Sequence, residues 1–278
     1  MIINILHLIR IQNIIISQIA IIVSYYLLNV KLFSFEFIIT IITVSIFMSF
    51  GNCINDIFDF ENDRISHPKR LLPQKKISLS LANIICIMLF FSGIFISSFL
   101  NFKTQIFLYC LIIPLLILYS IKLKAIPLAG NIVIAFLLSS VFIFSELVIF
   151  QTYYKLIIPT LLIFSFSLLR EIIKDLQDYD GDKKYNFKTF PVYFGISRTI
   201  NLLIILILAF IFISTVPFFI MLNYNIQYLV SIIIIIEIPL IFILVLLIKY
   251  PNKIMFKSIA FITKIMSILG LLIFILLQ

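Results

Sequence analysis

Two acidic clusters contain most of the carboxylates in the chain. Nine of the 12 Asp and Glu residues lie within 56–63 and 171–182. The same offsets of 0, 4, 7 and 11 residues occur in two sets that lie 119 residues apart, namely Asn52, Asp56, Asp59 and Asp63, and Glu171, Asp175, Asp178 and Asp182. At about 100° per residue, each set projects from one face of a helix. Two such carboxylate stripes facing each other would repel unless cations neutralised them.

Divalent metal ions are natural partners for these stripes. In proteins Mg²⁺ is usually held by one or two carboxylates, several waters and the phosphate oxygens of a substrate. We therefore predict that Mg²⁺ holds a diphosphate between the clusters. The predicted ligands, which are also the predicted catalytic residues, are Asp56, Asp59 and Asp63 for one ion and Asp175, Asp178 and Asp182 for the other. A solvated helix end balanced by lysines is an alternative, but it would not require the matched spacing to occur twice.

Polar and basic residues beside the clusters are candidates for binding the substrate. Lys and Arg can form charge-assisted hydrogen bonds with a diphosphate, and the candidates for this role are Arg70, Lys122, Lys124 and Lys174. Either Lys122 or Lys124 could reach the diphosphate, and both could equally be charges that orient the helices. Asn55 is expected to assist the first metal ion.

The remaining candidates lie deeper along the helices or near the N-terminus. Asn52 and Glu171 are one turn deeper than the aspartates, where they could orient the metal ligands or support the acceptor. Tyr119 is either a substrate-binding residue or an aromatic anchor at the membrane interface. Asn13 could face the cavity and bind substrate, whereas we expect Arg10 to extend to the lipid headgroups.

The composition places these residues in a membrane protein. Of the 278 residues, 63% are hydrophobic and 12% are charged, whereas a soluble domain is about half apolar and a quarter charged. A water-soluble fold is therefore excluded. Disorder and nucleic-acid binding are excluded as well, because both need charge that is absent here. An acid inside a membrane is usually functional, but the sequence assigns no role to Glu146 and Glu237.

Nine segments are long and apolar enough to cross the roughly 30 Å hydrocarbon core, which predicts an all-α, polytopic bundle. The expected spans are 11–30, 35–55, 80–101, 104–121, 126–149, 154–174, 198–221, 226–248 and 255–277. Long polar loops are expected at 56–79 and 175–197. The face that holds the N-terminus and both loops carries 17 of the 21 Lys and Arg residues, so we expect it to be cytoplasmic. One domain is expected over 1–278, with an internal repeat that matches the second span to the sixth.

The clusters resemble the signatures of the UbiA superfamily of intramembrane prenyltransferases. Its motif N-D-x-x-D-x-x-x-D is matched by Asn55, Asp56, Asp59 and Asp63, and its motif D-x-x-D-x-x-x-D by Asp175, Asp178 and Asp182. Within the superfamily, the stretches most similar to the digeranylgeranylglyceryl phosphate synthases are 50–80, 119–144 and 170–195. One departure is the loop 70–75, where Arg-Leu-Leu-Pro-Gln-Lys replaces the family's R-P-x-P-S-G.

The resemblance implies an enzyme that uses Mg²⁺ to transfer a prenyl group from a polyprenyl diphosphate to a lipid-soluble acceptor. The synthases that it most resembles join geranylgeranyl diphosphate to geranylgeranylglyceryl phosphate through an ether bond, which predicts a multi-pass enzyme of the cell membrane with the same substrates. Quinone- and chlorophyll-type members have related motifs, so an aromatic acceptor is an alternative. A cation-coupled transporter is another, since repeats and intramembrane acids also occur in transporters. Against it, the acids here gather at one membrane face.

Overall fold

The computed structural model describes residues 2–66, 68–185, 187–221 and 224–277, and these contain helices and no strands. In chain order the elements are α1 (Ile2–Leu8), α2 (Ile11–Leu27), α3 (Phe35–Ser66), α4 (Leu79–Ser97), α5 (Phe102–Phe107), η1 (Leu108–Ile112), α6 (Ile113–Ile121), η2 (Leu123–Ala125), α7 (Ala129–Phe150), α8 (Ile157–Lys184), α9 (Phe190–Phe194), α10 (Ile196–Ile220), α11 (Ile226–Ile232), η3 (Ile233–Glu237), α12 (Ile238–Lys249), α13 (Lys253–Ile273) and η4 (Phe274–Leu277). The prediction of an all-α fold is confirmed.

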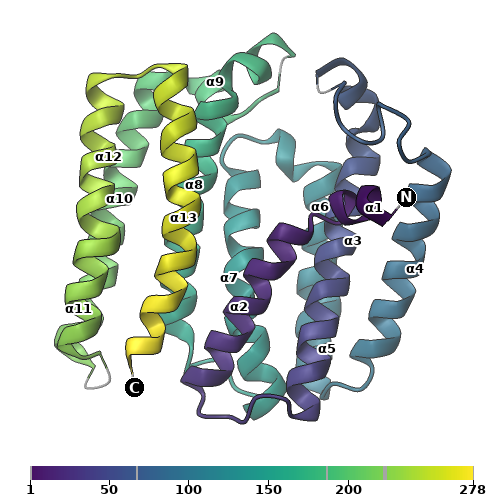
Figure 1. Ribbon diagram of the computed structural model, residues 1–278, viewed down its shortest axis with the longest axis horizontal. Coiled ribbons are helices and arrows are strands. Elements are labelled where there is room, and N and C mark those ends of the chain that lie inside the picture. The colour runs from purple at the N-terminus through teal and green to yellow at the C-terminus, as the bar shows by residue number, and fades with distance from the viewer. Residues whose placement is uncertain (1, 67, 186, 222–223, 278) are drawn as a thin grey trace.

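The long helices lie side by side and form a bundle (Figure 1). Within the described ranges, seven helical stretches are long and apolar enough to cross a membrane, or eight if the bent pair α1–α2 counts as one span. The two helices of that pair meet at an angle of 61°. α8 is not one of the seven, because Arg170, Glu171 and Lys174 lie close to its apolar half. The chain is therefore a multi-pass membrane protein.

Local backbone changes interrupt two of the predicted spans and precede a third. The spans expected at 104–121 and 226–248 each contain a π-helical turn, η1 or η3, followed by Pro114 or Pro239. Proline has no N–H to donate to the carbonyl four residues earlier, and a π turn accommodates that missing bond. The first span begins at a corner, because Arg10 adopts a left-handed conformation with φ of 55° and ends α1 there.

The acid-bearing helices extend further than predicted. α3 continues to Ser66 and α8 to Lys184. The prediction of polar loops at 56–79 and 175–197 is therefore wrong for the acidic part of each segment, which is helical. Hydropathy predicts where the chain leaves the hydrocarbon core of the membrane. The backbone hydrogen bonds of a helix can continue beyond that point, so a span predicted from hydropathy can end before its helix does. Both carboxylate stripes are therefore carried on helices instead of loops.

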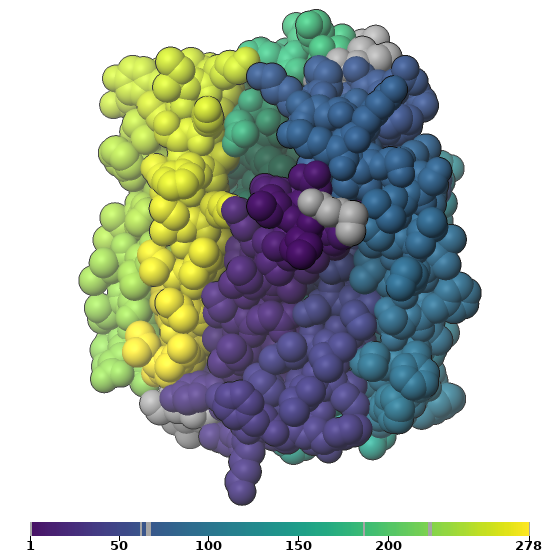
Figure 2. Space-filling model, turned by 45° about the vertical axis from the view of Figure 1, so that its right-hand side comes forward, coloured from purple at the N-terminus to yellow at the C-terminus, as the bar shows by residue number. Residues whose placement is uncertain are grey.

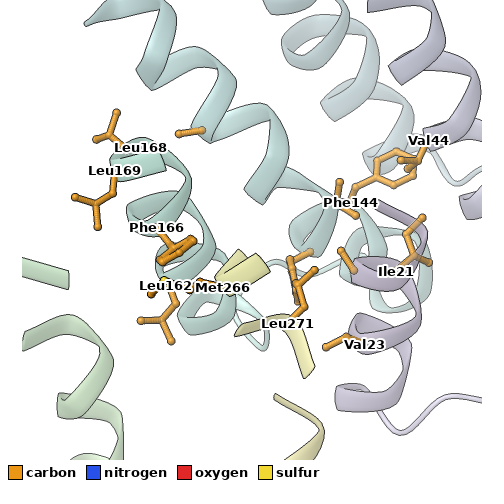
Figure 3. Packing of buried hydrophobic residues seen from close by; sticks show 14 of the residues in the cluster. Ile21, Val23, Val44, Phe144, Leu162, Phe166, Leu168, Leu169, Met266 and Leu271 are labelled. Atoms are coloured by element: carbon orange, nitrogen blue, oxygen red, sulfur yellow. The ribbon is translucent and has the colours of Figure 1, made fainter. Parts of the chain in front are cut away.

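Buried apolar side chains hold the helices together. Leu162 and Phe166 of α8 lie beside Met266 of α13 (Figure 3). Phe166 also packs edge-on against Phe210 of α10, with ring centroids 5.7 Å apart. In a membrane such van der Waals packing, more than the exclusion of water, drives helix association. These contacts fix α8 between α10 and α13, and so fix the second acidic stripe.

Candidate active site

The two acidic stripes lie at the same end of the bundle. α3 and α8 both reach the upper edge in Figure 1, next to α9 and the loop after α3. Both stripes are helical through their last members, Asp63 and Asp182, as the spacing predicted. Tyr119 of α6 lies between them, since its hydroxyl is within electrostatic range of both Lys174 on α8 and Asp59 on α3.

Each aspartate of the first cluster is paired with a cation from a different segment. The cations come from the α1–α2 corner, from η2 and from the loop after α3. The pairs are Arg10–Asp56 at 2.6 Å, Lys124–Asp59 at 2.5 Å and Arg70–Asp63 at 2.7 Å. Protein cations therefore neutralise all three carboxylates of this cluster, and two distant parts of the chain, together with the loop that follows α3, are joined to this helix.

The position of Lys124 depends on how α6 ends. Lys122 leaves the helical conformation with φ of −138°, and the tight turn η2 follows. The turn brings Lys124 to α3, where its Nζ also donates to Asn55 Oδ1 at 3.3 Å. The following chain passes so close that a Cβ on Gly130 would lie 3.1 Å from Lys124 Cα. Of the two lysines that the sequence left open, Lys124 is the one that reaches the cluster, whereas Lys122 is exposed.

The second cluster is bound by neutral groups. Asp175 accepts a hydrogen bond from Asn131 Nδ2, near the start of α7, at 2.9 Å. Asp178 accepts one from Gln177 at 3.4 Å. Among the described residues, neither of these aspartates nor Asp182 forms an ion pair. Burial, together with the neighbouring charge of Asp178, raises the pKa of the Asp182 carboxyl to about 6. These carboxylates are consequently open to an added cation.

Polar residues one turn deeper anchor both stripes. Glu171 is buried and is bonded by Arg170 at 2.9 Å and by Lys174 at 3.2 Å. The Arg170 Nε is also buried and has no hydrogen-bond partner among the described residues. On α3, Asn52 Nδ2 donates to the carbonyl of Ile9 at 2.9 Å and so ties the α1–α2 corner to the helix. Both deeper residues thus support their stripes from below.

A polar cavity of about 80 Å³ lies beside the second cluster and extends to Lys124. Its walls include Tyr119, Lys124, Asn131, Glu171, Lys174 and Asp175. Lys124 is bonded to the first cluster and Asp175 belongs to the second, so a ligand in this cavity would contact groups from both.

An apolar cavity of about 70 Å³ lies deeper, between α3, η1, α6 and α7. Phe47, Leu116 and Phe144 are among its lining residues. Gly51 lets α6 approach α3 beside this cavity, because a Cβ there would lie 2.7 Å from Leu116 Cδ2. The bundle therefore offers apolar space on the membrane side of the acidic end.

Sequence reasoning missed two residues that contact the aspartates. The expectation that Arg10 extends to the headgroups is wrong, because its guanidinium bonds Asp56. Asn131 was not a candidate, although a lone amide near the start of an apolar helix is a usable signal. Asn13 is exposed, and its side chain forms no hydrogen bond within the described part of the chain.

The donor chemistry fits a divalent cation better in the second cluster than in the first. Mg²⁺ takes carboxylate oxygens and keeps several waters, and the oxygens of Asp178 and Asp182 are not paired with described cations. In the first cluster such oxygens are already bonded by Arg or Lys. No three acidic, His or Cys side chains in the described ranges are gathered around one metal position.

The fold and the site together define a family. The chain matches the UbiA prenyltransferase family over residues 18–265, and it belongs to that family. It is therefore an intramembrane prenyltransferase, and the superfamily predicted from the two aspartate motifs is confirmed.

Within the family, the chain is similar to digeranylgeranylglyceryl phosphate synthases. It is 34% identical to that of Sulfurisphaera tokodaii over 87% of this chain and 86% of the relative, and 33% identical to that of Methanocaldococcus jannaschii over 89% and 86%. A solved structure of a digeranylgeranylglyceryl phosphate synthase superposes with a TM-score of 0.78 at 32% identity, covering 98% of this chain and 96% of that one. A UbiA homolog from Archaeoglobus fulgidus bound to GPP and Mg²⁺ shares the fold, with a TM-score of 0.70 at 18% identity over 98% and 99%.

Proposed function

We propose that the chain transfers a geranylgeranyl group from geranylgeranyl diphosphate to geranylgeranylglyceryl phosphate and so forms the ether bond of a membrane lipid. The observation that carries this proposal is a polar cavity lined by Glu171 and Asp175 of the second stripe and by Lys124, which is bonded to Asp59 of the first. The names of the relatives support the same acceptor and product. The homolog bound to GPP and Mg²⁺ supports the same kind of donor and cofactor.

The two clusters share the binding of the diphosphate. The residues that would hold Mg²⁺ are Asp175, Asp178 and Asp182 for one ion, and Asp56, Asp59 and Asp63, with Asn55 assisting, for the other. Bound Mg²⁺ acts as a Lewis acid on the oxygens of the leaving diphosphate. Lys124, Lys174 and Arg70 add charge-assisted hydrogen bonds to those oxygens, and Tyr119 lines the same cavity. Asn52 and Glu171 keep the stripes in place, and Lys122 and Asn13 lie at the exposed edge of the site.

The apolar bundle protects the reacting carbon. As the C–O bond to the diphosphate breaks, positive charge develops on the allylic carbon, and water would capture it. The apolar side chains around the cavity beside Phe47, Leu116 and Phe144 would line the path of the prenyl chain and keep water from this carbon. The oxygen of the acceptor hydroxyl then bonds to this carbon to form the ether, its proton passes to the released diphosphate or to water, and the diphosphate leaves from the charged end of the bundle.

The proposed topology places this charged end in the cytoplasm. The nine spans would be α2, α3, α4, α5–α6, α7, α8, α10, α11–α12 and α13. The loops at the acidic end carry most of the Lys and Arg residues, and such loops usually remain cytoplasmic. The chain forms one domain, 1–278, in which α3 and α8 occupy equivalent places of an internal repeat.

Product mass spectrometry tests the proposed reaction. The full chain in lipid nanodiscs is supplied with Mg²⁺, geranylgeranyl diphosphate and either geranylgeranylglyceryl phosphate or a hydroxybenzoate. We expect an ether-linked product from the first acceptor. A C-prenylated aromatic without any ether lipid would reject the proposed acceptor in favour of a quinone-type reaction. Cation flux in vesicles without prenyl transfer would reject both and favour the transporter.

A further inference from the structure

A lysine lies halfway along a membrane helix and is not explained by the site. Lys264 is 11 residues beyond Lys253, the start of α13, which places it about 16 Å into the helix and near the middle of a roughly 30 Å hydrocarbon core. A cation at that depth is costly and usually functional. None of the ion pairs among the described residues includes Lys264.

The contact that Lys264 makes is with a neutral group of α2. Its Nζ donates to Gln12 Oε1 at 3.2 Å. Gln12 follows Arg10 by two residues, and Arg10 bonds Asp56 of the first cluster at 2.6 Å. The lysine therefore lies at the seam between α13 and α2, two residues along α2 from the arginine that bonds the first cluster.

The surface of the molecule is hollowed above the α1–α2 corner. Figure 2 shows a hollow above the corner of α1 and α2, bounded by α13 and by the chain after α3, with atoms in the colour of α8 at its floor. Gln12 lies at the start of α2, directly after this corner. Gln12 and its partner Lys264 therefore lie close to this corner, two residues along α2 from the arginine that bonds Asp56.

We propose that Lys264, positioned by Gln12, binds the phosphate of the lipid acceptor. This inference rests on the proposed function, since that acceptor carries a phosphate beside the hydroxyl that must react. A phosphate supplies the anion that Lys264 lacks, and an ammonium binds phosphate as a point charge. In the proposed function Lys124, Lys174 and Arg70 bind the diphosphate, so the acceptor phosphate requires a separate positive group. Lys264 is thus a determinant of acceptor specificity.

The test compares two acceptors that differ only in the phosphate. Lys264→Met, Lys264→Arg and the control Lys257→Met, which removes an exposed lysine of the same helix, are assayed in nanodiscs with geranylgeranylglyceryl phosphate and with geranylgeranylglycerol. We expect Lys264→Met to lose roughly 10- to 100-fold in kcat/KM for the phosphorylated acceptor, chiefly through KM. Its KM for geranylgeranyl diphosphate and its kcat/KM for the dephosphorylated acceptor should stay within about twofold of the original. Lys264→Arg should retain most of the activity, and Lys257→Met all of it.

A direct measurement of acceptor binding tests the inference even if the dephosphorylated acceptor does not react. Calorimetric titration of geranylgeranylglyceryl phosphate, without the diphosphate, should show the same loss of affinity in Lys264→Met. Equal losses on both acceptors, an altered KM for the diphosphate, or unchanged acceptor affinity would overturn the inference. If the unsubstituted protein makes no ether product, the proposed function is rejected together with this inference. If the unsubstituted protein is active and Lys264→Met is unimpaired, only the inference about Lys264 is rejected.

Discussion

The two acidic clusters have the same residue spacing and different electrostatic partners. On α3, Arg10, Lys124 and Arg70 each hold one aspartate. On α8, Asp175 is bound by the amide of Asn131 and Asp178 by that of Gln177. The position equivalent to Arg70, 119 residues later, is Thr189, a neutral residue beside Asp182.

From this difference in partners we infer that the two clusters bind metal ions at different stages of the reaction. A carboxylate already bonded to Arg or Lys must give up that partner, or share it, before it binds a metal ion. The second cluster has no such obstacle among the described residues, so we infer that it is the first to take Mg²⁺. The cations of the first cluster are then available to the diphosphate once that substrate arrives with its own metal.

Loss of the central aspartate in either cluster should cause a severe defect in prenyl transfer. Asp59→Asn and Asp178→Asn each remove a proposed metal ligand, and we expect kcat/KM to fall by about 100-fold or more. The matched controls are Glu61→Gln and Asp180→Asn, which alter exposed acids two residues further along the same helices. The controls should stay within about twofold. If the control variants lose as much kcat/KM as Asp59→Asn and Asp178→Asn, the defect comes from removing any negative charge on these helices and not from the loss of a metal ligand.

Lys124→Met should separate metal binding from catalysis. Removing the lysine frees Asp59, so Mg²⁺ affinity of the first cluster should rise by roughly 10-fold. Prenyl transfer should fall by about 10-fold, because a cation that faces the diphosphate is lost. Isothermal titration calorimetry and the kinetic assay measure the two effects on the same preparation. A fall in both quantities would contradict the distinction between the clusters, and Lys122→Met serves as the neighbouring control.

Acidification should affect the second cluster through Asp182. The pKa of this carboxyl is raised to about 6 by burial, so below pH 6 it is mostly protonated and cannot bind metal. Substrate-free Mg²⁺ affinity should therefore fall by a few-fold between pH 7 and pH 5.5, an order-of-magnitude expectation from that pKa. Asp182→Asn should weaken this dependence, because one of the carboxyls that titrate in the second cluster is removed, while Asp63→Asn retains it in full. A pH profile that Asp182→Asn leaves unchanged would assign the titration to another group.

The sequence predicts the features that depend on local spacing. The 0-4-7-11 offsets place each carboxylate stripe on one helix face, and the structure shows both stripes on helices. Hydropathy locates most of the spans, since an apolar segment of about 20 residues has few alternatives to crossing the bilayer.

Contacts between distant segments were harder to predict. Arg10 reaches Asp56 because a left-handed residue turns the chain before α2. Lys124 reaches Asp59 because a tight turn ends α6. Neither change in backbone direction occurs at a glycine or a proline, the residues from which such a change could have been predicted. The π turns, in contrast, are followed by Pro114 and Pro239, a signal that hydropathy alone ignores.

Metal binding without substrate tests the difference between the clusters most directly. Mn²⁺ is titrated into the original chain, Asp59→Asn and Asp178→Asn, each in nanodiscs without diphosphate, and free Mn²⁺ is followed by electron paramagnetic resonance. We predict that Asp178→Asn abolishes the tighter binding and that Asp59→Asn leaves it intact. Loss of that binding in Asp59→Asn, with Asp178→Asn unaffected, would contradict the assignment of the first metal ion to α8.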